Sequence, residues 1–268
     1  MTVHPELIAK VEVEGASYPS LKGKGVIVTG GGSGIGASLV EHFCAQGCKV
    51  GFIELSDRAA MHNADEVERS TGNRPTAEVA DLRDVDALRA AVSRLGPQIG
   101  PVRVLVNNAG NDDRLPLEEV TPDYWDERFA TNLRHQFFAA QAVIDEMAKA
   151  GGGAIINMGS ISWMMGAAGL IFYTTAKSAV MGLTKSLARE VGERNIRVNS
   201  IAPGWVLTER QVERAKRVYQ GKFAEYLKVQ CLKEHLLPPD IARMALWLAA
   251  DDSRLVTGQT FVVDAGVV

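Results

Sequence analysis

The chain has 268 residues, of which 46% are hydrophobic and 23% charged, as in ordinary soluble globular proteins. A formal net charge of −3 gives no electrostatic case for binding nucleic acid or an anionic membrane surface. No apolar run approaches the ~18 residues that span a bilayer, and the first twenty residues lack the apolar core of a secretory signal. Three cysteines do not indicate a disulfide framework, and five histidines lack the spacing of metal ligands. We therefore expect a cytoplasmic protein without a metal.

The first predicted unit is a strand, a glycine-rich turn and a helix. Residues 1–20 are predicted to be an extension ahead of a single domain over 21–268. The apolar run Gly25–Thr29 has strand length and leads into the glycine-rich segment 30–36, and helical spacing then continues to Gly47. Such a turn lets the backbone approach a pyrophosphate, which the N–H groups of the helix N-terminus would bind.

The second predicted strand, residues 49–53, ends in Glu54. A carboxylate at this point can accept hydrogen bonds from both ribose hydroxyls of an adenosine and would repel a 2′-phosphate. Glu54 therefore favours NAD over NADP. Arg58 lies close by in the sequence and weakens this preference, because it could contact a phosphate.

Strands and helices then alternate with short connections: a helix over 57–70, a strand over 76–80, a helix after the cap residue Asp84, and a strand over 102–106. Asp81 follows the third strand, where its carboxylate could accept a hydrogen bond from an adenine amino group. The small residues of Asn107–Gly110 follow the fourth strand. This alternation predicts a doubly wound α/β fold of the Rossmann type, with helices on both faces of a parallel sheet.

The second half of the chain continues the same pattern. Thr121, Pro122 and Asp123 form a helix start, and the helix is expected to continue through residue 144 with Asn132 in its middle. Because Asn is disfavoured inside helices, Asn132 is either a surface residue or a positioned one. The remaining predictions are a strand over 154–157, a helix over 173–192, a strand over 195–201, a helical lid over 205–237, a helix over 240–250 and a seventh strand over 259–264.

Tyr173 and Lys177 lie one helical turn apart on the same face of a predicted helix. An ammonium a few ångströms from a phenol favours the phenolate and lowers the pKa of the tyrosine. The pair could therefore accept the proton of an alcohol. On its own, the pattern is weak, because it occurs often by chance and is more typical of a packed Tyr and a solvated Lys.

Several motifs in the same order resemble the short-chain dehydrogenase/reductase family over nearly the whole chain. They are Thr29-Gly30-x-x-x-Gly34-x-Gly36, Glu54, Asp81, Asn107-Asn-Ala-Gly110, Asn132, Ser160, Tyr173-x-x-x-Lys177, and Pro203-Gly204 with Thr208. The chain departs from the family pattern in the extra glycines at 31 and 32. It also has Glu at position 54, where members that use NAD often have Asp.

The resemblance implies a catalytic set and a bound NAD. It makes Tyr173 the acid/base, Lys177 the residue that holds the nicotinamide ribose and lowers the pKa of Tyr173, Ser160 a donor to the reacting oxygen, and Asn132 the anchor of a water that links Lys177 to solvent. The cofactor-binding residues that it implies are Gly30, Ser33, Gly34, Ile35, Gly36, Glu54, Asp81, Leu82, Asn108, Ala109, Gly110, Tyr173, Lys177, Pro203, Gly204, Val206 and Thr208.

Other stretches resemble bacterial aldose 1-dehydrogenases, above all those that act on xylose and form an aldonolactone. These stretches are Asn108–Arg114, Trp125–Arg128, Asn132–His135, Gly159–Trp163 and Gln230–Lys233. We expect Asn111, Asp112 and Arg114, together with Ser160 and Tyr173, to contact the sugar, and Trp163 to stack on its C–H face. Alternatively, Asp112, Asp113 and Arg114 form a surface ion-pair network or a subunit contact.

Two other functions stay open. One is an NAD(P)-dependent reductase of ketones or 3-oxoacyl groups, or a secondary-alcohol dehydrogenase, in the same family. The other is a non-catalytic dinucleotide-binding protein, although such proteins usually lack the Tyr or the Lys. The resemblance also implies a homotetramer or homodimer assembled through long helices, including the one that carries Tyr173.

Overall fold

The computed structural model describes residues 15–218 and 222–268. Most of the extension predicted for residues 1–20 thus lies outside the described residues. Its last residues pack on the domain: Tyr18 N donates to Gln46 Oε1 at 2.8 Å, and Ser20 Oγ accepts from Asp251 N at 3.1 Å. Between them begins a short 3₁₀ turn, Pro19–Leu21.

A seven-stranded parallel sheet forms the centre of the molecule, in the order β3-β2-β1-β4-β5-β6-β7. The strands are apolar over most of their length because both faces of the sheet are covered. They are β1 (Gly25–Thr29), β2 (Lys49–Glu54), β3 (Thr76–Val79), β4 (Val102–Asn107), β5 (Gly153–Met158), β6 (Ile196–Pro203) and β7 (Thr260–Val263).

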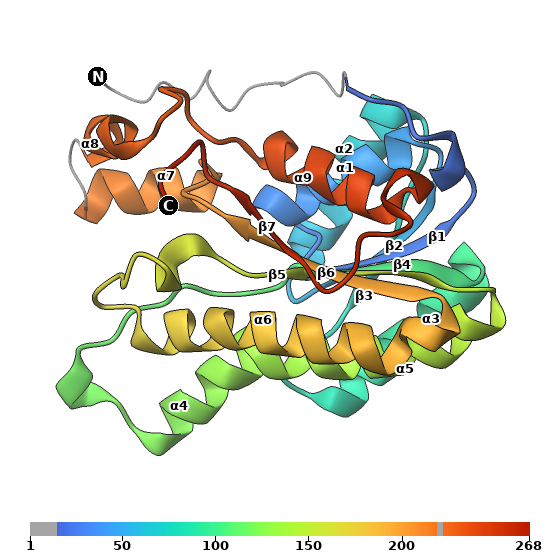
Figure 1. Ribbon diagram of the computed structural model, residues 1–268, viewed down its shortest axis with the longest axis horizontal. Helices are drawn as coiled ribbons and strands as arrows, with labels where there is room; N and C mark the ends of the chain where they lie inside the picture. The colour runs from blue at the N-terminus through green and yellow to red at the C-terminus, as the bar shows by residue number, and fades with distance from the viewer. Residues whose placement is uncertain (1–14, 219–221) are drawn as a thin grey trace.

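Helices cover both faces of the sheet, with α1, α2 and α9 on one side and α3, α5 and α6 on the other (Figure 1). The α-helices are α1 (Gly34–Ala45), α2 (Asp57–Thr71), α3 (Val85–Ile99), α4 (Pro122–Phe129), α5 (His135–Lys149), α6 (Ile171–Val191), α7 (Glu209–Val218), α8 (Lys222–Val229) and α9 (Pro238–Ala249). Within the described ranges, none of the helices is long and apolar enough to cross a membrane.

Two hydrophobic cores result from the alternation of side chains along each strand. Val26 and Val28 of β1 face the core beneath α1, α2 and α9, whereas Ile27 between them faces the core beneath α3, α5 and α6. All three side chains are fully buried. The sheet is therefore held on both sides, which fixes the positions of the loops at its ends.

The strand order reverses between β1 and β4, because the chain builds β1, β2 and β3 outward and then crosses back to β4. In open α/β sheets, ligands bind in the crevice outside the carboxyl ends of the strands at such a point. The loops after β1 and β4, and those after β5 and β6, border this crevice. Helices α7 and α8 lie together at one end of the sheet (Figure 1).

The predicted doubly wound fold is confirmed, and two of the predicted helices are corrected. The helix predicted from Thr121 through residue 144 is divided by a π turn, Ala130–Arg134, into α4 and α5. The helix predicted from Asp240 begins at Pro238, because proline is well accommodated in the first helical turn. The predicted lid, 205–237, contains α7 and α8, and residues 219–221 between them lie outside the described residues.

Candidate active site

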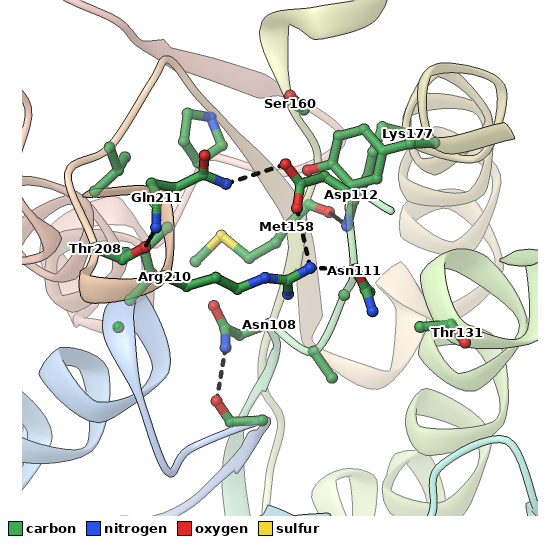
Figure 2. A pocket seen from close by; sticks show the side chains of 18 of the residues that line it. Asn108, Asn111, Asp112, Thr131, Met158, Ser160, Lys177, Thr208, Arg210 and Gln211 are labelled. Atoms are coloured by element: carbon green, nitrogen blue, oxygen red, sulfur yellow. Dashed lines mark hydrogen bonds and ion pairs between the residues drawn. The ribbon is translucent and has the colours of Figure 1, made fainter. Parts of the chain in front are cut away.

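A cleft of about 1010 Å³ opens at the carboxyl ends of the strands. Every residue predicted to contact the dinucleotide lines it, together with Ser160, Asn111 and Asp112 (Figure 2). Asn132 and Trp163 lie outside the set of described residues that line the cleft. The structure therefore brings most of the predicted site residues to one place.

The glycine-rich turn between β1 and α1 is a close-packed cradle. Gly30 has φ +65°, a conformation that favours glycine, and a Cβ on Gly36 would lie 1.8 Å from Gly30 O. Ser33 precedes α1 without making a side-chain capping hydrogen bond in the described part of the chain. The first N–H groups of α1 therefore remain available for an anion such as a pyrophosphate.

The extra glycines at 31 and 32 allow the turn to pack directly on β2. A Cβ on Gly31 would lie 2.6 Å from Phe52 Cβ, and one on Gly32 would lie 2.7 Å from Glu54 Cγ. Gly32 N instead donates to Glu54 Oε2 at 2.9 Å, and Leu55 N donates to Oε1 at 2.9 Å. The carboxylate of Glu54 is thus held at the end of β2, the position from which it is predicted to accept hydrogen bonds from the adenosine ribose.

The loop after β4 is fixed to the end of β1. Thr29 Oγ1 accepts from Asn108 N at 3.0 Å and from Ala109 N at 3.1 Å. Asn108 Nδ2 donates back to Gly30 O at 3.0 Å (Figure 2). These bonds place two segments that are about eighty residues apart in sequence side by side at the crevice.

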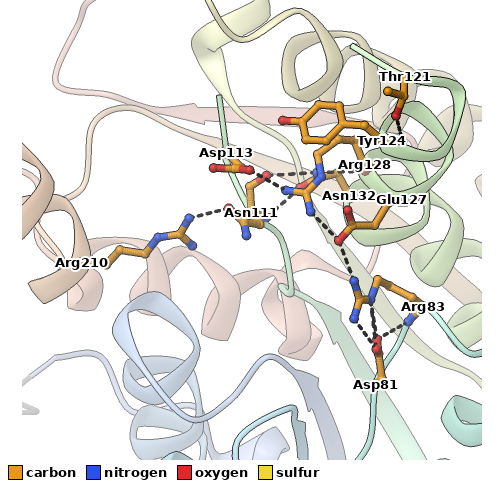
Figure 3. A network of polar contacts seen from close by, with 10 residues as sticks. All are labelled: Asp81, Arg83, Asn111, Asp113, Thr121, Tyr124, Glu127, Arg128, Asn132 and Arg210. Carbon is orange, nitrogen blue, oxygen red and sulfur yellow. Dashed lines mark hydrogen bonds and ion pairs between the residues drawn. The ribbon is translucent and has the colours of Figure 1, made fainter. Parts of the chain in front are cut away.

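Asp81 belongs to a chain of charged residues along the cleft (Figure 3). Arg83 donates to both carboxylate oxygens of Asp81 and also contacts Glu127, which pairs with Arg128. The Arg83 guanidinium holds the pKa of the Asp81 carboxyl below its usual value. An adenine amino group bound to Asp81, as predicted, would therefore share this carboxylate with Arg83.

Tyr173 and Lys177 lie on the first turns of α6 and reach the cleft together. Lys177 Nζ lies 5.6 Å from the centre of the Tyr173 ring and donates to Met158 O at 2.8 Å. Burial lowers the pKa of Lys177 to about 8. The predicted spacing of the pair is confirmed.

In the cleft as the structure describes it, the pKa of Tyr173 is raised rather than lowered. Burial and the charge of Asp112 raise the pKa of Tyr173 to about 12, against a hydrogen bond to Ser160 and the charge of Arg210, which lower it. The physical reason is desolvation of the phenolate, which here outweighs the neighbouring positive charge.

Asn132 lies in the π turn and is fully buried beside the Tyr–Lys pair. Its Oδ1 accepts from Asn111 N at 2.8 Å, and its Nδ2 donates to Asn111 O at 3.1 Å and to Arg128 O at 3.0 Å. A Cβ on Gly110 would lie 3.2 Å from Asn132 Oδ1 and 3.3 Å from Lys177 Nζ. Asn132 is therefore a positioned residue that fixes the loop after β4.

Sequence reasoning did not assign a role to His135, which is buried one turn beyond Asn132. Its Nε2 lies 3.1 Å from Ala109 O, so the neutral ring donates to the cofactor-facing loop. Burial and the charge of Lys177 lower the pKa of His135 to about 3. The available signal was its spacing of three from Asn132 on the same helical face.

Asp112 is engaged by side chains of α7 (Figure 2). Gln211 Nε2 donates to Asp112 Oδ2 at 3.0 Å, Arg210 Nη2 lies 3.3 Å from Oδ1, and Arg214 forms an ion pair with Oδ2. Arg210 also donates to Asn111 Oδ1. Asp112 is therefore part of an ion-pair network, formed with the arginines of α7 at the border of the cleft. The sequence signal for the α7 residues was a charged stretch with i, i+4 spacing.

Trp163 lies beside the cleft without being among the described residues that line it. It ends a 3₁₀ turn, Ile161–Trp163, whose neighbours Ser162 and Met165 line the cleft while the indole lies outside the set of described lining residues. A short 3₁₀ turn directs successive side chains in different directions, so proximity in sequence to Ser160 did not place Trp163 on the cleft.

The chain is similar in sequence to known proteins over nearly its whole length. A family model described as enoyl-(acyl carrier protein) reductase matches residues 30–268. The chain is 46% identical to D-xylose 1-dehydrogenase of Caulobacter vibrioides (strain NA1000 / CB15N) and 45% identical to the probable galactose dehydrogenase GalD of Rhizobium meliloti (strain 1021). Both alignments cover 94% of this chain and 98% of the relative.

Solved structures are similar over the same range. A 7α-hydroxysteroid dehydrogenase complexed with NADH and 7-oxo glycochenodeoxycholic acid matches with a TM-score of 0.86 and 31% identity, covering 93% of this chain and 96% of the other. A blue fluorescent protein from a metagenomic library, in complex with NADPH, matches with a TM-score of 0.82 and 38% identity, covering 92% and 99%.

Proposed function

The chain belongs to the short-chain dehydrogenase/reductase family, and from this premise we propose that it oxidises the anomeric hydroxyl of an aldose to the aldonolactone with NAD. Membership makes the protein an oxidoreductase that uses a nicotinamide dinucleotide. The observation that carries the proposal is the convergence of Tyr173, Lys177 and Ser160 on the same cleft as the glycine cradle. The names of two relatives at 45–46% identity support a sugar substrate.

In the oxidation of the substrate, each residue of the site would have a distinct role at the reacting hydroxyl. Tyr173 Oη takes its proton, and Ser160 donates a hydrogen bond to the oxygen as negative charge develops there. Lys177 and the backbone of Asn108–Gly110 would hold the nicotinamide ribose. Bound oxidised nicotinamide would supply the hydride acceptor and a positive charge that favours the phenolate. Such a charge is needed, because the pKa of Tyr173 is about 12 in the cleft described here.

The preference for NAD rests on Glu54. Its carboxylate is held by the N–H groups of Gly32 and Leu55 at 2.9 Å each, so it cannot easily turn away from a cofactor ribose. A 2′-phosphate at this position would meet a fixed negative charge. Arg58 is exposed on α2, four residues beyond Glu54 in the sequence, and is the side chain that could offset this repulsion.

A sugar would find polar side chains directly beside the phenol. Asn111 and Asp112 follow β4, and Arg210 and Gln211 face them from α7 (Figure 2). Planar amide, carboxylate and guanidinium groups can accept from and donate to several hydroxyls at once. We therefore retain Asn111 and Asp112 as substrate residues and leave Trp163 out.

A panel of pentoses, hexoses and deoxyhexoses with NAD, followed by NADH formation, tests the proposal. The expected result is turnover of at least one aldose and its conversion to the lactone, with lower kcat/KM when NADP replaces NAD. Turnover of none of these sugars, together with reduction of a ketone or a 3-oxoacyl substrate, would overturn it.

We also propose that copies of the chain associate through α4, α5 and α6. Large apolar side chains are exposed on these helices, among them Trp125, Phe137 and Ile171. Burying such side chains against a second copy would stabilise a dimer or tetramer. Light scattering of the purified protein would show this, and a monomer at micromolar concentration would exclude it.

A further inference from the structure

Side chains of α7 converge on one carboxylate beside the predicted catalytic phenol. Asp112 Oδ2 accepts from Gln211 Nε2 at 3.0 Å and pairs with Arg214, while Arg210 Nη2 lies 3.3 Å from Oδ1. We call these four residues the α7 clasp. It joins the loop after β4 to the helix that borders the other side of the cleft (Figure 2).

The members of the clasp differ in burial. The side chains of Asp112 and Arg214 are each 19% exposed, whereas that of Arg210 is 50% exposed. Arg210 and Gln211 line the cleft, and Arg214 lies outside the set of described lining residues. Arg214 therefore holds Asp112 in a shielded position, where removal of one partner leaves the other charge poorly compensated.

The two oxygens of Asp112 are occupied to different extents. Oδ2 receives both Gln211 and Arg214, whereas Oδ1 meets Arg210 at 3.3 Å. A carboxylate offers about four acceptor positions. Oδ1 thus keeps capacity for a hydroxyl group, and Arg210 beside it can donate to a second one.

The charge of Asp112 also acts on the phenol. Asp112 raises the pKa of Tyr173, and Arg210 lowers it. The groups that face the phenol are Ser160 from the loop after β5, Lys177 from α6, Asp112 from the loop after β4 and Arg210 from α7. Arg214 reaches this set through its ion pair with Asp112.

We propose that Arg214 is a positioning residue that holds the carboxylate of Asp112. In this position, Asp112 Oδ1 accepts a hydrogen bond from the substrate hydroxyl next to the one that Tyr173 deprotonates. This inference rests on the proposed function and deepens it. The substrate class that it names is a sugar with two adjacent hydroxyls at the reacting end, one for Tyr173 and one for Asp112. A sugar that lacks the neighbouring hydroxyl, a 2-deoxyaldose, would leave Asp112 without this partner.

The test compares the wild type, Arg214→Gln, Asp112→Asn and the double variant, each on an aldose and its 2-deoxy analogue. We expect either single change to lower kcat/KM for the aldose about tenfold through KM, and the double variant to be no worse than Asp112→Asn. The preference for the aldose over its 2-deoxy analogue should collapse in all three variants. Arg214→Lys should restore most of the activity.

The pH profile supplies a second readout that loss of structure alone would not produce. In Arg214→Gln the charge of Asp112 is less balanced, so the acid limb of kcat should move to higher pH by about one unit. In Asp112→Asn the limb should move to lower pH. Arg69→Gln, on the exposed face of α2, is the matched control and should change neither readout.

Any of three results would overturn the inference. The effects of the two single changes on kcat/KM could be strictly additive in the double variant, or the variants could keep the wild-type preference for the aldose over its 2-deoxy analogue. The acid limb of kcat could also stay unmoved in Arg214→Gln while NAD binding is intact. If no aldose is turned over, the proposed function fails first. The four proteins are then compared on whichever alcohol is oxidised. If the acid limb of kcat moves in Arg214→Gln, the positioning role of the Arg214–Asp112 pair is supported. If the limb does not move, that role is rejected.

Discussion

The absence of a Cβ at Gly110 leaves room for the buried amide of Asn132 and the buried ammonium of Lys177. Asn132 Oδ1 and Lys177 Nζ lie 3.2 and 3.3 Å from the point that a Cβ on Gly110 would occupy. Both neighbours are themselves constrained, Asn132 by the backbone of Asn111 and Lys177 by Met158 O. A side chain at this position would therefore displace groups that cannot easily move.

Gly110→Ala should lower kcat about tenfold, because a misplacement of 1 Å in a catalytic group can cost as much as ~100-fold. The matched control is Gly96→Ala in α3, where a Cβ would meet nothing within 4 Å. That change should leave kcat unaltered and stabilise the helix by ~0.5–1 kcal/mol. Equal activity of the two variants in steady-state assays would contradict the crowding at Gly110.

The residues that set the acidity of Tyr173 could be predicted only in part. The spacing of Tyr173 and Lys177 follows from helix geometry and was foreseeable. The opposing influence of Asp112 was not, because it depends on a contact between α6 and the loop after β4, more than sixty residues earlier. A sequence pattern indicates which groups share a helix face but not which charges face them from elsewhere.

At the scale of elements, local chemistry made most of the fold predictable. Apolar runs, the Asp84 and Thr121 caps and the glycine turn placed the strands and most helices within a few residues of where they lie. The π turn at Ala130–Arg134 was not predictable, since no Pro or Gly marks it. Asn132 within this turn makes tertiary hydrogen bonds to Asn111, which a local sequence pattern does not indicate.

The end of β2 carries a prediction about cofactor choice. Glu54→Gln removes the negative charge and keeps one side-chain oxygen, which can accept from the N–H group of Gly32 or of Leu55 but leaves the other without its acceptor. The ratio of kcat/KM for NAD over NADP should fall about tenfold, equivalent to about 1.4 kcal/mol.

Glu66→Gln, on the solvent side of α2, serves as the control and should leave the ratio unchanged. A ratio that is the same in Glu54→Gln and the wild type, measured by initial rates with both cofactors, would remove Glu54 as the determinant.

At the scale of the whole molecule, His135 makes folding stability depend on pH. The pKa of this buried ring is about 3, against an ordinary value of 6.5. Above pH 6.5 the ring is neutral in the folded and the unfolded chain. As the pH falls below 6.5 the unfolded chain binds a proton that the folded chain does not, so stability is lost progressively towards pH 3.

Between pH 7 and pH 5 this group should lower the free energy of unfolding by about 2 kcal/mol. Urea unfolding at the two pH values, for the wild type and His135→Gln, would measure it. The wild type should lose more stability than the variant by about that amount. Equal losses would show that His135 does not stay neutral in the folded protein.

The account as a whole depends on the phenol of Tyr173 acting on an alcohol beside a bound dinucleotide. The most direct measurement compares wild type and Tyr173→Phe in two assays, NAD binding by fluorescence titration and aldose oxidation by NADH formation. We predict that the variant binds NAD with nearly unchanged affinity and loses about 10²–10⁴-fold in kcat. A variant that binds NAD and still oxidises the sugar at the wild-type rate would contradict the account.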